Sequence, residues 1–179
     1  MADYLLDTMI LRYWYNTDCD ENPKVRARVE TVRQPDPQTK HIPRLLISAI
    51  TIGEIEYGHR RSSPPDPSVQ TKYMSFIREN CPEYLEVDSH VGECYGVLKA
   101  WLFNTCPPWN KLGKAKRLKE LVYPPSGEAL GVDENDLWIA AQAMANDLVL
   151  VTHDFRHHFG KLLCHFKSTL QIDVDDWAQ

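Results

Sequence analysis

The sequence of 179 residues predicts an α/β fold in which helices cover both faces of a central, mainly parallel sheet. Short apolar, β-branched runs alternate along the chain with segments of helical periodicity. The two patterns adjoin within residues 133–154, where a helical segment is followed by the unbroken apolar run Leu148–Thr152, typical of a strand buried on both faces. Only Asn146 and Asp147 separate them, so a short loop joins helix and strand, as in parallel sheets. The apolar residues at helical spacing are Ile139, Ala140, Ala143 and Met144.

Length and composition predict one domain. The chain is 43% hydrophobic, and no apolar run reaches the length of a membrane span. No basic stretch precedes an apolar segment at the N-terminus, so no signal peptide is expected. The five cysteines form no C-x-x-C pair, which disfavours a disulfide framework or a structural zinc site and favours the cytoplasm. A net charge of −5 requires local basic patches or bridging metal ions for any nucleic-acid partner.

The N-terminal half is expected to contain two buried strands, each leading into a helix. Tyr4–Leu6 is the first strand, and Asp7 or Thr8 caps the helix that follows it. Residues 16–43 are polar and proline-rich, and we expect a surface insertion there with one exposed helix. The predicted elements of this half are Tyr4–Leu6, Met9–Trp14, Lys24–Arg33, Leu45–Ser48, Ala49–Gly58 and Val69–Asn80.

The C-terminal half continues the alternation of helices and strands. A second insertion is expected at about 104–127, and it carries the densest group of basic residues in the chain. Asp133 is expected to cap the helix that contains Asp136. The predicted elements are a strand at Tyr84–Val87, a helix at Asp88–Phe103, the helix and strand of 133–154, a short helix or turn at Phe155–Leu163 and a strand at Leu170–Val174.

Several classes of site are disfavoured by missing motifs. No glycine-rich dinucleotide fingerprint follows a strand, and there is no P-loop. No Gly-x-Ser-x-Gly element and no neighbouring Cys–His pair marks a covalent nucleophile. A phosphorylatable receiver domain would have paired acids after its first strand, where Asp7 stands alone. The histidines also match no zinc motif in their spacing: His153, His157, His158 and His165.

Four carboxylates occupy positions that a parallel sheet would bring together: Asp7, Glu54, Asp136 and Asp154. Asp7 and Asp154 follow strands, while Asp136 lies in the first turn of a helix. Glu54 and Glu56 lie two residues apart and so face different sides of their helix. Carboxylate oxygens suit Mg²⁺ or Mn²⁺, which can activate a water for attack on a phosphodiester.

At these residues the sequence resembles the PIN-domain nucleases, and most closely their bacterial toxin branch, the VapC toxins of type II toxin–antitoxin systems. The resemblance rests on four segments in the same order along the chain: Tyr4–Thr8, Ile47–Gly58, Asn135–Ala141 and Leu150–Phe155. It covers the predicted core but neither insertion. It implies a three-layer α/β/α PIN-like domain over residues 1–179.

The resemblance also implies a metal-dependent endoribonuclease that is commonly dimeric and is neutralised by a cognate antitoxin. By position, the four acids Asp7, Glu54, Asp136 and Asp154 are the expected catalytic and metal-binding residues. Thr152 supports the last of these acids, and Thr8 and Asn135 lie in the same segments as further supporting residues. The hypothesis is cleavage of RNA by metal-activated water in the cytoplasm.

Basic residues outside these segments are candidate contacts to the RNA backbone: Arg60, Arg61, Lys114, Lys116 and Lys119. Two alternatives stay open. One is a metal-dependent nuclease for structured DNA, and the other is a non-catalytic, protein-binding module on the same fold. Comparing RNA with flap DNA as substrates would test the first, and measuring Mg²⁺ or Mn²⁺ binding would test the second.

Overall fold

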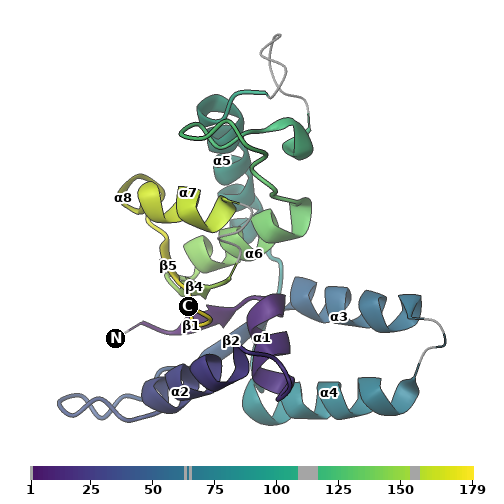
Figure 1. Ribbon diagram of the computed structural model, residues 1–179. Coiled ribbons are helices and arrows are strands. Elements are labelled where there is room, and N and C mark those ends of the chain that lie inside the picture. Colours follow the sequence, from purple (N-terminus) through teal and green to yellow (C-terminus); the bar gives the residue numbers. More distant parts are fainter. Residues whose placement is uncertain (1, 63, 65, 109–116, 154–157) are drawn as a thin grey trace. The chain divides into compact units, whose positions relative to one another are not determined.

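The computed structural model describes residues 2–62, 64, 66–108, 117–153 and 158–179. It divides into two compact units. The first unit consists of Met1–Glu86, Val149–His153 and Asp175–Gln179, and the second of Val87–Leu148 and Asp154–Val174. Figure 1 shows the elements of both units. The prediction of a single domain stays a prediction.

Within the described residues the strands form one five-stranded sheet in the order β3-β2-β1-β4-β5. The strands are β1 (Tyr4–Leu6), β2 (Leu45–Ser48), β3 (Tyr84–Leu85), β4 (Val149–Val151) and β5 (Asp173–Asp175). Strand β1 pairs in parallel with β2 and β4, and β2 pairs in parallel with β3. The predicted α/β fold with a mainly parallel sheet is therefore confirmed.

The register of the central strands sets the positions of the residues that follow them. Leu6 at the end of β1 lies opposite Ile47 of β2 and Val151 of β4. The three strands therefore end within one residue of one another. The residues that follow β1 and β4, Asp7 and Thr152, lie at the same edge of the sheet.

The helices of the first unit pack around a core of apolar side chains. They are α1 (Thr8–Tyr15), α2 (Asn22–Val32), α3 (Ala49–Arg61) and α4 (Pro67–Asn80). The prediction that α2 is exposed is wrong for one face of the helix. Val25, Val29 and Val32 on that face are buried, in the same core cluster as Leu6 and Ile10. The valine stripe follows the helical period, so the helix within 16–43 contributes to the core.

The second unit is mainly helical. Its elements are α5 (Ser89–Thr105), the 3₁₀ turn η1 (Leu118–Glu120), α6 (Glu134–Ala145), α7 (Phe159–His165) and α8 (Lys167–Leu170). Helices α5 and α6 pack through a cluster in which the Tyr95 and Trp138 rings stack at 3.8 Å between centroids. The predicted last strand begins too early, because Leu170 ends α8 and β5 starts at Asp173.

The remaining expectations concern membranes and cysteines. No helix in the described part of the chain is long and apolar enough to cross a membrane. None of the five cysteines, all of which lie among the described residues, forms a disulfide. Burial raises the pKa of the Cys81 thiol to about 12, consistent with a role in packing rather than as a nucleophile.

Candidate functional site

The Asp7 carboxylate, at the carboxyl end of β1, accepts two hydrogen bonds from residues that the structure describes. Asp7 is the N-cap of α1, where its Oδ1 accepts a hydrogen bond of 2.6 Å from the Thr8 amide. Its Oδ2 accepts a bond of 2.8 Å from the hydroxyl of Thr152. Thr152 directly follows β4 and is 4% exposed, so the parallel pairing of β1 with β4 holds the two side chains together.

Glu54 reaches the same place from helix α3. Its Oε2 accepts a hydrogen bond of 2.5 Å from the Thr8 hydroxyl, and Thr8 Oγ1 also lies 3.4 Å from Thr51 Oγ1. Asp7 and Glu54 are thus both bonded to Thr8, one through its amide and one through its hydroxyl. We call Asp7, Thr8, Glu54 and Thr152 the acid cluster.

Glu56 points elsewhere, as the helical spacing predicts. It accepts a bond of 2.8 Å from Arg60 Nε and a second bond from the side chain of Gln70 on α4. The fully buried Thr51 was missed by sequence reasoning. It stands three residues before Glu54, a helical spacing that places both on one face of α3 and could have revealed it.

The second unit holds Asp136 in a capping box at the start of α6. The Asp133 carboxylate accepts bonds from the amides of Asn135 and Asp136, at 2.8 and 3.1 Å. In return Asp136 Oδ2 accepts a bond of 2.8 Å from the Asp133 amide. The prediction that Asp133 caps this helix is confirmed.

The convergence of all four acids stays a prediction. Asp136 belongs to the second unit, whereas Asp7 and Glu54 belong to the first, and Asp154 lies outside the described residues. Within the ranges that the structure describes, no group of three or more His, Cys, Asp or Glu side chains is placed to hold a metal ion.

An ionic contact fixes the first turn of α6 to α5. Lys99 Nζ lies 2.7 Å from Glu134 Oε1, and the Tyr95 hydroxyl also bonds to Glu134. The hydrogen bond from Lys99, followed by that from Tyr95, lowers the pKa of Glu134 from 4.5. The same contact with Glu134, followed by that with Tyr95, raises the pKa of Lys99 from 10.5.

The contact is expected to stabilise the protein over a defined pH range. The lowered pKa of Glu134 gives stability that is present above pH 4.5 and is lost as the pH falls through the folded-state pKa. The raised pKa of Lys99 gives stability that is present below pH 10.5 and is lost at higher pH. Lys99→Met is therefore expected to reduce the free energy of unfolding by at most about 1 kcal/mol, because both groups are partly exposed.

Urea titrations at several pH values would measure that difference, with Lys161→Met on α7 as the control. The difference between wild type and Lys99→Met should stay level near neutral pH and shrink below pH 4.5. An equal difference at pH 3 and pH 7 would contradict the assigned contact.

The basic residues predicted to contact RNA have varied surroundings. Arg60 pairs with Glu56 at 2.5 Å, and the Arg61 guanidinium lies 6.0 Å from the Tyr57 ring centroid. Lys119 is exposed in η1. Lys114 and Lys116 lie outside the described residues, so their assignment stays a prediction.

His153 has a partner that sequence reasoning missed. Its Nδ1 lies 2.9 Å from Asp176 Oδ2, and the Asp176 side chain is only 4% exposed. The two residues are 23 positions apart, and no local pattern links them. The contact holds the segment that contains Asp176 against His153, the residue that follows Thr152.

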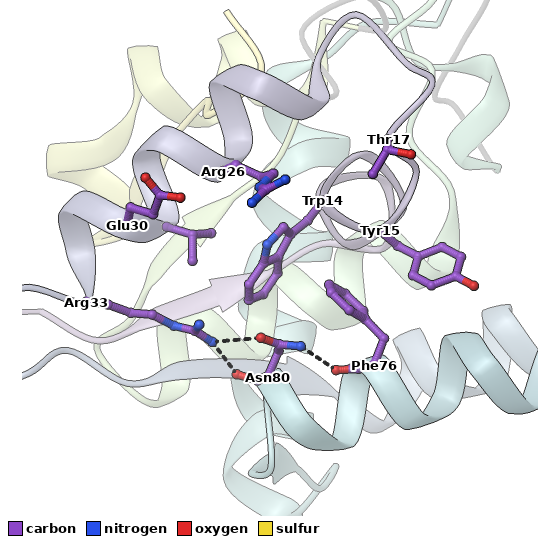
Figure 2. A pocket seen from close by; sticks show the side chains of 9 residues that line it. Trp14, Tyr15, Thr17, Arg26, Glu30, Arg33, Phe76 and Asn80 are labelled. Carbon is purple, nitrogen blue, oxygen red and sulfur yellow. Dashed lines mark hydrogen bonds between the residues drawn. The ribbon is translucent and has the colours of Figure 1, made fainter.

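Two cavities among the described residues of the first unit lie beside helix α1. One, of about 340 Å³, lies among α1, α2 and α4 and is lined by Trp14 and Arg33 (Figure 2). The Arg33 guanidinium lies 5.0 Å from the Trp14 ring centroid and donates to the carbonyl and side-chain oxygens of Asn80. This cavity therefore holds a cation of the protein itself. The other cavity, beside α3, adjoins the acid cluster through Thr8.

Comparisons with known proteins give a likeness in structure alone. No protein-family model and no curated protein matches the sequence. The chain is similar to solved structures of VapBC2 from Rickettsia felis bound to a promoter DNA fragment (20% identity, 97% and 98% of the two chains covered, TM-score 0.63). It is also similar to DNA-bound VapBC from Salmonella typhimurium (20% identity, 99% of each chain covered, TM-score 0.62).

A third similar structure is VapBC-5 from Mycobacterium tuberculosis, described as a member of the VapBC family of toxin–antitoxin systems (18% identity, 98% and 99% covered, TM-score 0.54). These similarities span nearly the whole chain in each case. They show that the chain has the PIN-like α/β fold of these toxin–antitoxin proteins, and the resemblance to VapC-type toxins is confirmed at the level of the fold.

Proposed function

We propose that the protein is a Mg²⁺- or Mn²⁺-dependent endoribonuclease that hydrolyses RNA phosphodiester bonds as the toxin of a toxin–antitoxin pair. The observation that carries the proposal is the acid cluster. Asp7 and Glu54 come from two different elements, and both are bonded to Thr8 at the edge of the sheet where parallel α/β folds bind their ligands. The likeness in fold to VapBC proteins supports the same function.

The donor set fits a hard divalent cation. Asp7 and Glu54 offer carboxylate oxygens, the ligands that Mg²⁺ and Mn²⁺ prefer, and no thiol or imidazole belongs to the acid cluster. Asp7 and Glu54, together with Asp136 and Asp154, would hold the cation. When bound, it would supply positive charge to the scissile phosphate and lower the pKa of a coordinated water.

The residues around these acids have supporting roles. The Thr152 hydroxyl orients the Asp7 carboxylate, and the Thr8 hydroxyl orients that of Glu54. Asn135 lies beside Asp136 in the first turn of α6. The proposed contacts to the RNA backbone are cationic side chains that would neutralise phosphate charge: Arg60, Arg61, Lys114, Lys116 and Lys119.

The partners proposed for the chain follow from the same function. A toxin nuclease in the cytoplasm requires a cognate antitoxin, and the similar structures are VapBC proteins, one of which is described as part of a toxin–antitoxin system. A homodimer is also proposed. Size-exclusion chromatography with light scattering would test both partners. The protein is measured alone for the homodimer and after co-expression with the candidate antitoxin for the toxin–antitoxin complex.

Two glutamates on α3 provide a matched test of the nuclease. Glu54→Gln is expected to lower the rate of RNA cleavage at least about 100-fold, because it removes the charge of a proposed metal ligand. Glu56→Gln is expected to cut within about threefold of wild type, since Glu56 bonds only to Arg60 and Gln70 among the contacts described.

The measurement is incubation of antitoxin-free protein with total cellular RNA in Mg²⁺, Mn²⁺ or EDTA, with product ends mapped by sequencing. Flap DNA is assayed in parallel. Discrete cuts in RNA that require metal and Glu54 would support the proposal. Cleavage of flap DNA but not of RNA would identify structured DNA as the substrate. Absence of any cleavage, together with no metal binding by calorimetry, would favour a non-catalytic, protein-binding module.

A further inference from the structure

The second unit contains a pocket of about 320 Å³, lined by residues of α5, of η1 and of the start of α6 (Figure 1). Phe103 of α5, Leu118 of η1 and Val132 form its apolar walls. Leu118 and Val132 are buried, whereas Phe103 is partly exposed. The volume is at the lower end of the range for small-molecule sites, in which apolar walls are combined with a few polar groups.

Two positively charged side chains that line this pocket have no partner in the described part of the chain. Arg117 and Lys119 are both exposed, and neither side chain forms an ion pair or a hydrogen bond with a described residue. A third cation of the lining, Lys99, is already bonded to Glu134 and to the Tyr95 hydroxyl. Arg117 and Lys119 are therefore accessible to an anion that enters from solvent.

The carboxylates that line the pocket, among the described residues, already have partners within the second unit. Glu134 Oε1 lies 2.7 Å from Lys99 Nζ, and Glu134 Oε2 accepts a bond from the Tyr95 hydroxyl. Asp133 Oδ1 accepts bonds from two amides at the N-terminus of α6, and the partial positive charge there offsets that of the carboxylate. Because both acids are compensated, the two exposed cations leave the pocket positive, although the whole chain has a net charge of −5.

The occupant that matches these walls and charges is an anion with an apolar or aromatic surface. An inorganic anion would leave the apolar walls uncovered, and an apolar side chain would leave Arg117 and Lys119 unpaired. A nucleotide has both parts. Its phosphate can pair with the two cations, and the face of its base can cover apolar and aromatic side chains.

The pocket also adjoins a residue of the proposed catalytic site. Asp133 lines the pocket, and its amide donates a bond of 2.8 Å to Asp136 Oδ2. Glu134, another residue of the lining, lies in the same first turn of α6 as Asp136. RNA bound at Asp136 would therefore have a neighbouring nucleotide at the pocket. This position favours RNA over other anions with an apolar surface, such as an acidic segment of a protein.

We propose that this pocket binds the nucleotide of the RNA substrate that adjoins the scissile phosphate, with its phosphate at Arg117 and Lys119 and its base against Phe103. The proposal rests on the proposed function, because Asp136 is the residue that connects the pocket with the cut. Contacts to a phosphate that is not cleaved position the strand and add affinity. The pocket should therefore set the KM for RNA and leave kcat nearly unchanged.

Binding is measured first, without cleavage. The full chain in EDTA is titrated with inorganic phosphate, ribose 5-phosphate and the four nucleoside 5′-monophosphates. At least one nucleotide is expected to bind about tenfold or more tightly than ribose 5-phosphate, which lacks the base. Arg117→Gln should weaken that nucleotide about tenfold, and Phe103→Leu, which keeps an apolar side chain but removes the ring, about fivefold. Arg78→Gln, at an exposed arginine of α4, removes the same charge and should bind as wild type does.

The cleavage assay then tests whether the pocket belongs to the path of the substrate. Arg117→Gln is expected to raise the KM for RNA about tenfold, while kcat stays within about twofold of wild type. The dependence of KM on salt concentration should also become weaker, because one phosphate contact is lost. Arg78→Gln should equal wild type in both respects. Thermal melts check that the variants are folded, and the two arginine variants should melt within a few degrees of wild type because both side chains are exposed.

The outcomes separate the pocket from the nuclease. RNA cleavage with equal binding of nucleotides and ribose 5-phosphate would overturn the pocket alone, as would equal KM values for Arg117→Gln and Arg78→Gln. Tighter binding of a capped glutamyl-leucine dipeptide than of any nucleotide would assign the pocket to a protein partner and overturn the proposal. Nucleotide binding that requires Arg117, without any RNA cleavage by the wild type, would overturn the proposed function and with it the placement of the nucleotide beside a cut.

Discussion

Asp7→Asn is expected to abolish RNA cleavage, with a fall in rate of at least about 100-fold, while the protein stays folded. The substitution removes the negative charge of a proposed metal ligand. Asparagine is as good an N-cap as aspartate, so its side-chain oxygen can still accept the bond from the Thr8 amide that begins α1. Since one charge near Glu54 is lost, stability should be equal to wild type or slightly higher.

Three measurements check this expectation: the cleavage rate, the affinity for Mn²⁺ by calorimetry, and the urea midpoint. Asp7→Ala serves as the comparison, because it removes both the charge and the cap. It should also abolish cleavage, but it should lower the free energy of unfolding by about 1 kcal/mol. Wild-type cleavage by Asp7→Asn would show that Asp7 has no catalytic role and only caps α1.

The fold could be predicted because its determinants are local. The buried strands Leu45–Ser48 and Val149–Val151 are short β-branched or apolar runs, and the cap residues Asp7 and Asp133 stand directly before helical periodicity. The helical spacing also separated Glu54, which bonds to Thr8, from Glu56, which bonds to Arg60. Each of these inferences needs only neighbouring residues.

Features that depend on distant residues could not be predicted. Nothing in the sequence links His153 with Asp176, and the helical spacing of the α2 valines does not show which elements they pack against. The pocket beside the acid cluster is formed from three helices, and the lack of a partner for Tyr73 Oη is a property of packing alone. Such contacts are set by how the elements meet in space.

The end of the chain is a strong case of such long-range packing, and we expect Trp177→Ala to destabilise the protein by about 3–5 kcal/mol. Trp177 is 1% exposed in the core of the first unit, with its ring 5.3 Å from that of Tyr4 on the central strand. Its Nε1 donates a bond of 2.9 Å to Asp175. The loss is a large fraction of the ~5–15 kcal/mol that stabilises a typical domain.

Urea unfolding measures this loss, with two control variants. Trp177→Phe keeps most of the ring and should lose about 1–2 kcal/mol, because Asp175 retains its bond of 2.5 Å from Arg28. Tyr57→Ala, at a side chain that is 62% exposed, should stay within about 0.5 kcal/mol of wild type. A Trp177→Ala variant as stable as Tyr57→Ala would show that the chain end does not belong to the core. If the chain end does belong to the core, Trp177→Ala should lower only the fraction of folded molecules. The rate of cleavage per folded molecule should then equal that of wild type, because Trp177 is not part of the acid cluster.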